Sequence, residues 1–164
     1  MNVLPLAARP AAARWLAGRF KAEWPDFFAS SSLEEIERDY FRAVPVEGRE
    51  LPVVLVAEVD AQVCGTVAIR TTGPDTHPGP WLSSLWVDEP FRGRGIGGEL
   101  TRAMTAEAWR RGHPELYACT ATAHRLFRRL VWEELGDFPY HGVTVTVFRV
   151  GRGAGPSVPS QSRP

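Results

Sequence analysis

The chain has 164 residues, which is enough for one domain with a substantial buried core. Apolar residues make up 44% of it, yet no apolar run approaches the ~18 residues of a membrane-spanning helix, and the N-terminus carries no signal-peptide pattern. Because its 19 basic residues equal its 19 acidic ones, no overall field favours nucleic acid, and any anion site must be local.

The first elements that the sequence predicts are a short strand and a helix. A strand over Asn2–Leu6 is followed by Pro10, which suits the first turn of a helix because its missing N–H is not needed there. Apolar residues then recur at helical spacing until Pro25 ends the pattern. The apolar face of this helix comprises Ala13, Leu16, Phe20 and Trp24.

A second helix is predicted from a capping motif. Ser32 and Glu35 have the spacing of a capping box, in which each side chain binds the other residue's backbone N–H. In the helix that follows, Leu33, Ile36 and Tyr40 would share one face.

The middle of the chain reads as three consecutive strands. Pro52–Glu58 and Val63–Thr71 are rich in β-branched residues and are joined by a turn at residues 60–62, which predicts a hairpin. Proline and glycine dominate Thr72–Pro80, so this segment is expected to be irregular. Trp81–Val87 then has the composition of another strand.

The last third predicts helices alternating with strands. A helix from about Gly97 to Arg111 is followed by a strand at Leu116–Thr120, a helix at Ala123–Leu130 and a closing hairpin of Trp132–Tyr140 and Val143–Val150. The buried side of the first of these helices is expected to carry Ile96, Leu100, Ala103, Met104 and Ala108.

This order of elements predicts a mixed α/β or α+β fold in a single domain over residues 1–150. Residues 151–164 are rich in glycine, proline and serine and are expected to form a flexible tail. The only two cysteines, Cys64 and Cys119, suit a reducing cytoplasm and give no disulfide or zinc framework, so no metal is expected.

The glycine-rich loop at residues 92–98 (RGRGIGG) carries the most informative chemistry. It joins a strand to a helix, and free backbone N–H groups at a helix start, together with the helix dipole, bind anions. Its glycines let the backbone approach a phosphate closely, and Arg92 and Arg94 can donate charge-assisted hydrogen bonds. The loop therefore predicts a phosphate cradle.

Other interpretations of this loop are weaker. The glycines at 93, 95 and 98 satisfy the dinucleotide fingerprint, but three strands and two helices precede them and no suitable acidic ribose ligand follows. A nucleotide P-loop is excluded because no Gly-Lys-Ser/Thr occurs at the right spacing. A glycine-rich surface turn with two arginines remains an alternative.

The run from Leu85 to Leu100 resembles motif A of the GNAT superfamily of acetyltransferases, whose pattern Arg/Gln-x-x-Gly-x-Gly/Ala is filled by Arg92, Gly95 and Gly97. By element order the resemblance extends from Leu51 to about residue 150. It implies a mostly antiparallel sheet of six to seven strands flanked by about four helices. It also implies that acetyl-CoA is the co-substrate, with the loop on its pyrophosphate. The residues implied to bind it are Leu85, Trp86, Val87, Arg92, Gly93, Arg94, Gly95, Ile96, Gly97, Gly98 and Phe127.

The resemblance implies direct attack of a neutral amine on the acetyl thioester, in a slot between strands 81–87 and 116–120. Many family members supply a tyrosine that protonates the leaving thiol and a carboxylate on the strand before motif A; here Phe127 and Ser83 occupy these positions. Weak substitutes on the acceptor side are Asp75, His77 and Tyr140, while Glu58 could also point into the cleft.

Two functions follow from these residues. The first is a cytoplasmic N-acetyltransferase, monomeric or homodimeric, that acts on an amine of a small molecule, peptide or protein and needs neither nucleic acid nor membrane. The second is a CoA-binding module without catalysis, which Ser83 and Phe127 favour because they replace the usual proton-transfer groups.

Overall fold

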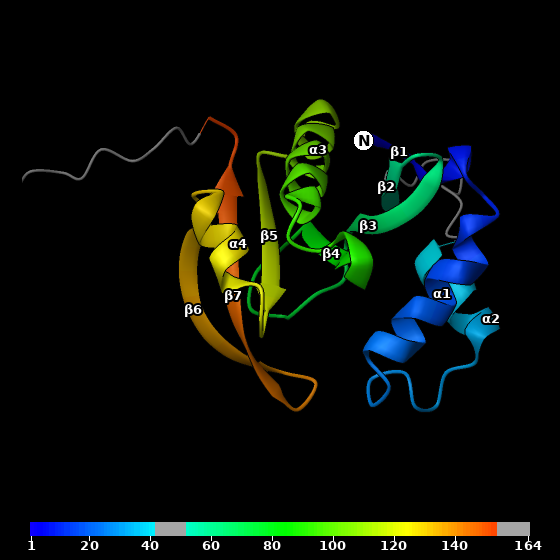
Figure 1. The fold of residues 1–164 in the computed structure, drawn as a ribbon. Coiled ribbons are helices and arrows are strands. Elements are labelled where there is room, and N and C mark those ends of the chain that lie inside the picture. Colours follow the sequence, from blue (N-terminus) through cyan, green and yellow to red (C-terminus); the bar gives the residue numbers. More distant parts are fainter. Residues whose placement is uncertain (42–51, 154–164) are drawn as a thin grey trace, which may run out of the picture.

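A computed structural model describes residues 1–41 and 52–153, and its centre is a seven-stranded sheet in the order β1-β2-β3-β4-β5-β7-β6 (Figure 1). Neighbouring strands are antiparallel except for the parallel pair β4 and β5. The mixed, mostly antiparallel sheet predicted from the sequence is therefore confirmed. The strands are β1 Asn2–Pro5, β2 Val53–Val59, β3 Gln62–Arg70, β4 Trp81–Val87, β5 Glu115–Thr120, β6 Glu133–Tyr140 and β7 Val143–Gly151.

Helices cover both faces of this sheet. On one face, Leu100 of α3 and Phe127 of α4 join Leu82 of β4 in the main apolar cluster. On the other face, Phe20 of α1 packs against Trp86 of β4, and Figure 1 shows α1 and α2 on the opposite side of the molecule from α4. None of the described helices is long and apolar enough to cross a membrane. The α-helices are α1 Ala12–Glu23, α2 Leu33–Ile36, α3 Ile96–Arg110 and α4 His124–Arg129.

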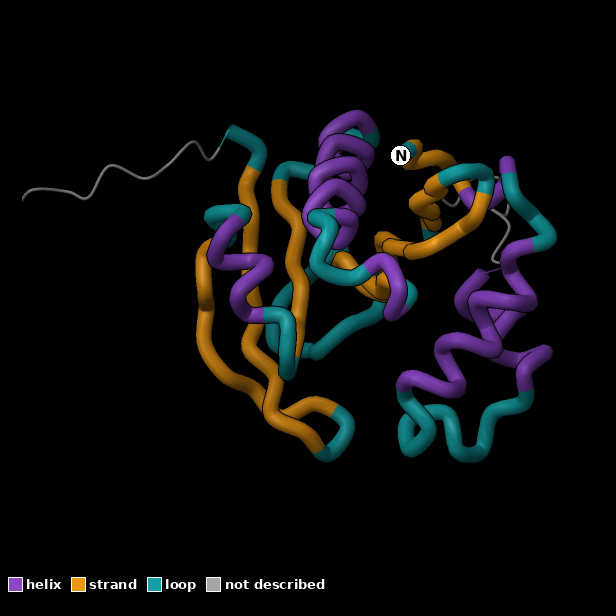
Figure 2. The backbone as a smooth tube through the Cα atoms, viewed as in Figure 1, coloured by secondary structure: helices purple, strands orange, loops and turns teal. Residues whose placement is uncertain are grey.

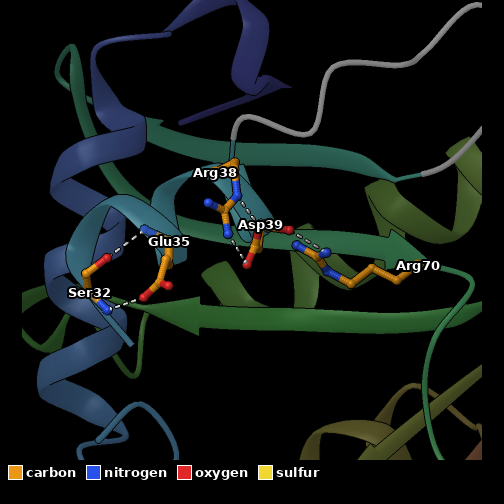
Figure 3. A network of polar contacts seen from close by, with 5 residues as sticks. All are labelled: Ser32, Glu35, Arg38, Asp39 and Arg70. Carbon is orange, nitrogen blue, oxygen red and sulfur yellow. Dashed lines mark hydrogen bonds and ion pairs between the residues drawn. The ribbon is translucent and has the colours of Figure 1, made fainter. Parts of the chain in front are cut away.

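The N-terminal helices agree with the sequence in their faces but not in all their ends. The capping box is present, because Ser32 Oγ accepts from the Glu35 N–H at 3.1 Å and Glu35 Oε2 accepts from the Ser32 N–H at 2.7 Å (Figure 3). After one turn α2 gives way to the π-helical segment η2, Glu37–Phe41, so the predicted helix is short. Pro10 precedes α1 instead of lying in its first turn, and Trp24 caps α1 with 37% of its surface exposed.

At the other end of the chain, the predicted tail begins too early. Gly151 is the last residue of β7, where it pairs with Glu115 at the start of β5, so the ladder extends one residue beyond the predicted strand. The rest of that tail, residues 154–164, lies outside the described residues. The single-domain boundary at residue 150 stays a prediction.

The two parallel strands at the centre of the sheet separate soon after they meet. Their register consists of Trp81 opposite Tyr117 and Leu82 opposite Ala118. Beyond Leu82, β4 bulges: its register with β3 jumps so that Ser84 and Leu85 stand opposite one β3 residue, and Ser84 adopts φ 54°. The two parallel strands are thus unpaired beyond Leu82 and Ala118, and this gap in the pairing is where the resemblance implies that the thioester lies.

Glu58 does not face this gap. The Nε of Arg9 donates to its Oε2 at 2.5 Å and Nη2 to its Oε1 at 3.0 Å, and the carboxylate is nearly buried. These hydrogen bonds lower the pKa of Glu58. The expectation that Glu58 could point into the cleft was therefore wrong, because its carboxylate pairs with Arg9 and joins β2 to the N-terminal segment.

Arg9→Met is expected to lower the melting temperature most at neutral pH, because it leaves the Glu58 carboxylate buried without its cation. A carboxyl group whose pKa is lowered in the folded protein stabilises the fold at pH values above its pKa in the unfolded chain, near 4.3. This stabilisation is lost as the pH falls through the lowered pKa. Melting curves of both proteins should therefore converge below about pH 4. Arg128→Met, which removes the more exposed pair with Glu134, is the control and should change little; equal losses in both variants would contradict the prediction.

Candidate functional site

The start of α3 presents a row of free backbone donors. Its N-cap Gly95 has φ 82°, and the first hydrogen bonds of the helix run from the N–H groups of Gly98 and Glu99 to the Gly95 carbonyl, at 3.0 and 3.2 Å. Within residues 1–41 and 52–153, no backbone carbonyl accepts from the N–H groups of residues 93–97. These donors lie at the positive end of the helix dipole, where free N–H groups can bind phosphate oxygens.

The backbone conformation requires glycine at position 95 of this loop but not at position 97. Gly95 needs its positive φ, which side chains other than glycine rarely adopt. Gly97 has no positive φ, and a Cβ there would meet Leu126 and Val87 only at an ordinary 3.9 Å. Since glycine inside a helix costs about 0.5–1 kcal/mol relative to alanine, the packing of the chain does not explain Gly97. Glycine at this position fits the predicted close approach of a phosphate to the backbone, which stays a prediction.

The two arginines of the loop are placed differently. Arg92 donates from Nε to the Val87 carbonyl at 2.8 Å and from Nη2 to Glu23 Oε2 at 2.7 Å, so it fastens the loop to β4 and α1. The guanidinium of Arg94 lies 5.3 Å from the ring centre of Phe91 and forms no ion pair with any residue that the structure describes. Arg94 is therefore the better placed of the two for a phosphate.

The predicted contact residues of β4 alternate between the two faces of the sheet. Leu85 and Val87 pack against the cluster on the α3 face, next to the loop. Trp86 is buried on the opposite face, and its Nε1 donates to Glu23 Oε2 at 3.3 Å. Only the first two side chains share the cradle's face, so Trp86 can contribute to acetyl-CoA binding through its backbone alone.

Two other predicted contacts belong to the apolar core. Ile96 is 3% exposed, which leaves its backbone N–H as its available donor. Phe127 is 2% exposed, stacks on Phe148 with ring centres 5.2 Å apart, and meets Trp132 edge-on at 5.0 Å. The sequence did not reveal that the position usually held by a tyrosine is here part of the packing between α4 and β7. The individual contacts to acetyl-CoA stay predictions.

On the face opposite α3, Tyr140 interacts electrostatically with residues that are distant from it in sequence. Burial raises the pKa of this phenol, and nearby Cys119, Tyr40 and Asp75 raise it further. Burial also raises the pKa of the Cys119 thiol to about 11. At neutral pH both groups are therefore protonated. Tyr40 and Cys119 were missed as members of this group, because nothing in their local sequence distinguishes them from core residues.

The remaining candidate, His77, lies in the irregular segment before β4. Its ring packs 5.2 Å from Tyr117 and 5.6 Å from Phe138, and its Nδ1 is 2.9 Å from Thr76 Oγ1. These contacts place His77 on the same face as Tyr140 but among aromatic side chains, where it covers the β5–β7 part of the sheet.

A pocket of about 560 Å³ opens on this face between the segment that joins α1 to α2 and the turn that joins β6 to β7. Phe28 and Tyr40 line one side and His141 the other, and the rings of Phe27 and His141 meet edge-on at 5.4 Å. The pocket is open to solvent and has the size of a small-molecule site.

Two of the carboxylates that line this pocket, those of Glu35 and Asp39, already have partners. Glu35 belongs to the capping box, and both oxygens of Asp39 accept from Arg38, at 2.7 and 3.1 Å (Figure 3). Arg70 donates to the carbonyls of Asp39 and Tyr40, each at 2.9 Å, which ties the end of η2 to β3. This network therefore shapes the wall of the pocket.

Comparisons with known proteins agree with this geometry. The family model described as "Acetyltransferase (GNAT) family" matches residues 13–136. Among solved structures, an aminoglycoside 6'-N-acetyltransferase complexed with coenzyme A is 16% identical, with a TM-score of 0.74 over 92% of this chain and 97% of that one. A ribosomal-protein-alanine N-acetyltransferase from Brucella melitensis is 22% identical, with a TM-score of 0.72 over 93% and 100%. The aminoglycoside 6'-N-acetyltransferase from Enterococcus faecium is 16% identical, with a TM-score of 0.71 over 92% and 97%. No curated protein matches the sequence significantly.

Proposed function

This chain belongs to the GNAT family of acetyltransferases, and from that premise we propose that it moves the acetyl group of acetyl-CoA to an amine of a small molecule or a peptide. The observation that carries the proposal is the row of free N–H groups at residues 93–97, placed at the start of α3 beside the gap between β4 and β5. Figure 2 shows the short connection that leads into α3.

The proposed binding mode follows from these donors. The N–H groups of the loop hold the pyrophosphate, Arg94 adds a charge-assisted hydrogen bond, and Arg92 keeps the loop in position through Val87 and Glu23. The pantetheine arm then follows β4 beyond Leu82, where β5 no longer pairs with it. This arrangement delivers the thioester to the bulge.

The reaction needs a neutral amine held in line with the thioester carbon. The nitrogen lone pair forms the new C–N bond, the C–S bond breaks, and the thiolate leaves with the electron pair. The nitrogen loses one proton and the thiolate gains one, so the products are an amide and a thiol. A backbone N–H of the bulged part of β4 is the proposed donor to the oxyanion, and Tyr140, protonated at neutral pH, is the proposed source of the thiol proton.

The amine acceptor is proposed to enter through the pocket between Tyr40 and His141. The relatives named above are named for two kinds of acceptor, an aminoglycoside and a ribosomal-protein alanine. Either kind reaches Tyr140 from this side, because His141 lines the pocket and its ring centre lies 4.2 Å from that of Tyr140. A cytoplasmic location is part of the proposal and is supported by the free thiols of Cys64 and Cys119.

The test is release of free thiol from acetyl-CoA across a panel that contains an aminoglycoside, a linear polyamine and a short peptide with N-terminal alanine. Turnover that depends on at least one amine, above the rate without amine, is the expected result. A CoA-binding module without catalysis would instead show a thermal shift with acetyl-CoA and no turnover on any member. That pattern would overturn the proposed function.

A further inference from the structure

Two adjacent hydroxyls on β4 are buried without a hydrogen-bond partner. The Oγ atoms of Ser83 and Ser84 are inaccessible to solvent and contact no donor or acceptor among the described residues. Buried hydroxyls nearly always have a partner, because leaving one unpaired destabilises the fold. Buried hydroxyls elsewhere in the sheet are paired: Thr66 on β3 donates to the Leu55 carbonyl at 3.1 Å. The two serines therefore point to a partner that the chain does not supply.

These serines stand where the sheet opens. Leu82 opposite Ala118 is the last rung between β4 and β5, and Ser83 is the next residue. Ser84 lies in the bulge with φ 54°, a conformation that residues other than glycine seldom adopt. The unpaired hydroxyls thus coincide with the point where the proposed thioester lies.

The direction of Ser83 follows from its neighbours. Leu82 packs on the α3 face, and Trp81 packs on the opposite face with Tyr117. Since successive side chains of a strand alternate, Ser83 shares the face of Trp81, which is also the face of Tyr140 and the pocket. The phosphate cradle belongs to the other face. Ser83 is therefore on the acceptor side of the reacting carbon.

We propose that the Ser83 hydroxyl positions the acceptor amine. Its Oγ accepts a hydrogen bond from an N–H of the amine and directs the nitrogen lone pair at the thioester carbon. As described above, the C–N bond forms while the C–S bond breaks. The proton that the amine loses passes to water. This role rests on the proposed function.

Ser83→Ala tests the proposal because it should lower the kcat/KM for the amine without lowering the melting temperature. The kcat/KM for the best amine of the panel is expected to fall about tenfold, the value of one well-placed hydrogen bond, while the KM for acetyl-CoA stays within twofold. The melting temperature should stay equal or rise, because the variant removes an unpaired buried hydroxyl. Ser83→Thr, which restores the hydroxyl, should recover most of the lost kcat/KM.

Thr66→Val is the matched control, because it removes a buried hydroxyl that has a partner on the neighbouring strand. It is expected to lower the melting temperature and to leave the amine kcat/KM within twofold of the parent. Wild-type kcat/KM in Ser83→Ala, or equal losses for amine and acetyl-CoA, would overturn the proposal. A parent protein that turns over no amine would instead overturn the proposed function, so the two failures are distinguishable.

Discussion

Replacing Gly95 with valine is expected to weaken acetyl-CoA binding at least 100-fold and to abolish measurable turnover. Gly95 caps α3 with φ 82°, a conformation that a β-branched residue adopts only with strain of about 1–3 kcal/mol. Relief of that strain would rotate the peptide units of residues 93–97, whose free N–H groups must converge to hold a pyrophosphate. Titration calorimetry with acetyl-CoA and the thiol-release assay measure the two effects.

The matched control for this variant lies at the other end of the same helix. Gly112 follows α3 with φ 84°, and a Cβ there would meet nothing within 4 Å. Gly112→Val therefore introduces similar backbone strain, and we expect a similar loss of stability, but acetyl-CoA affinity within threefold of the parent. If Gly95→Val bound acetyl-CoA as well as Gly112→Val does, the loop would not be the phosphate cradle.

Features that depend on a few neighbouring residues could be predicted from the sequence. The capping box at Ser32 and Glu35, and the helix that starts at the glycine loop, are set by local hydrogen bonds and local backbone freedom. The strands around Thr72–Pro80 were located for the same reason, since proline and glycine interrupt regular structure wherever they occur. Local chemistry thus fixed the element order and the position of the donor site.

Partners that are distant in sequence could not be predicted in this way. Glu58 was assigned to the cleft because it ends a strand, but its partner Arg9 comes from a segment that the sequence does not connect with β2. Arg92 combines a local contact to Val87 with a distant one to Glu23, and only the fold reveals the second. Such pairs depend on how helices dock on the sheet, which follows from the packing of many side chains at once.

The same limit applies to the acceptor side, because its residues come from separate elements. Phe28, Tyr40 and His141 come together around one pocket only when the segment after α1, η2 and the turn between β6 and β7 are assembled around the sheet. The donor side is a single loop, so one sequence motif was enough to predict it. This difference explains why the sequence identified acetyl-CoA more readily than its amine partner.

Phe20→Ala is expected to cost about 3–5 kcal/mol of unfolding free energy, the typical loss for a buried phenylalanine. Phe20 is 1% exposed and is the centre of the aromatic cluster that holds α1 and η2 on β4. Its ring contacts Trp24, Phe28, Tyr40, Phe41 and Trp86. Urea denaturation followed by tryptophan fluorescence measures the loss, and the amine KM should rise because Tyr40 and Phe28 line the acceptor pocket.

Phe27→Ala separates the loss of stability from the rise in the amine KM, because Phe27 is 51% exposed and lines the same pocket beside His141. We expect its unfolding free energy to stay within about 0.5 kcal/mol of the parent, while the amine KM still rises. In both variants the folded protein should keep the affinity for acetyl-CoA, since the cradle at residues 93–97 lies on the other face of the sheet. A loss of acetyl-CoA affinity as large as the change in amine KM would contradict this division, and would mean that α1 and η2 support the donor site as well as the acceptor site.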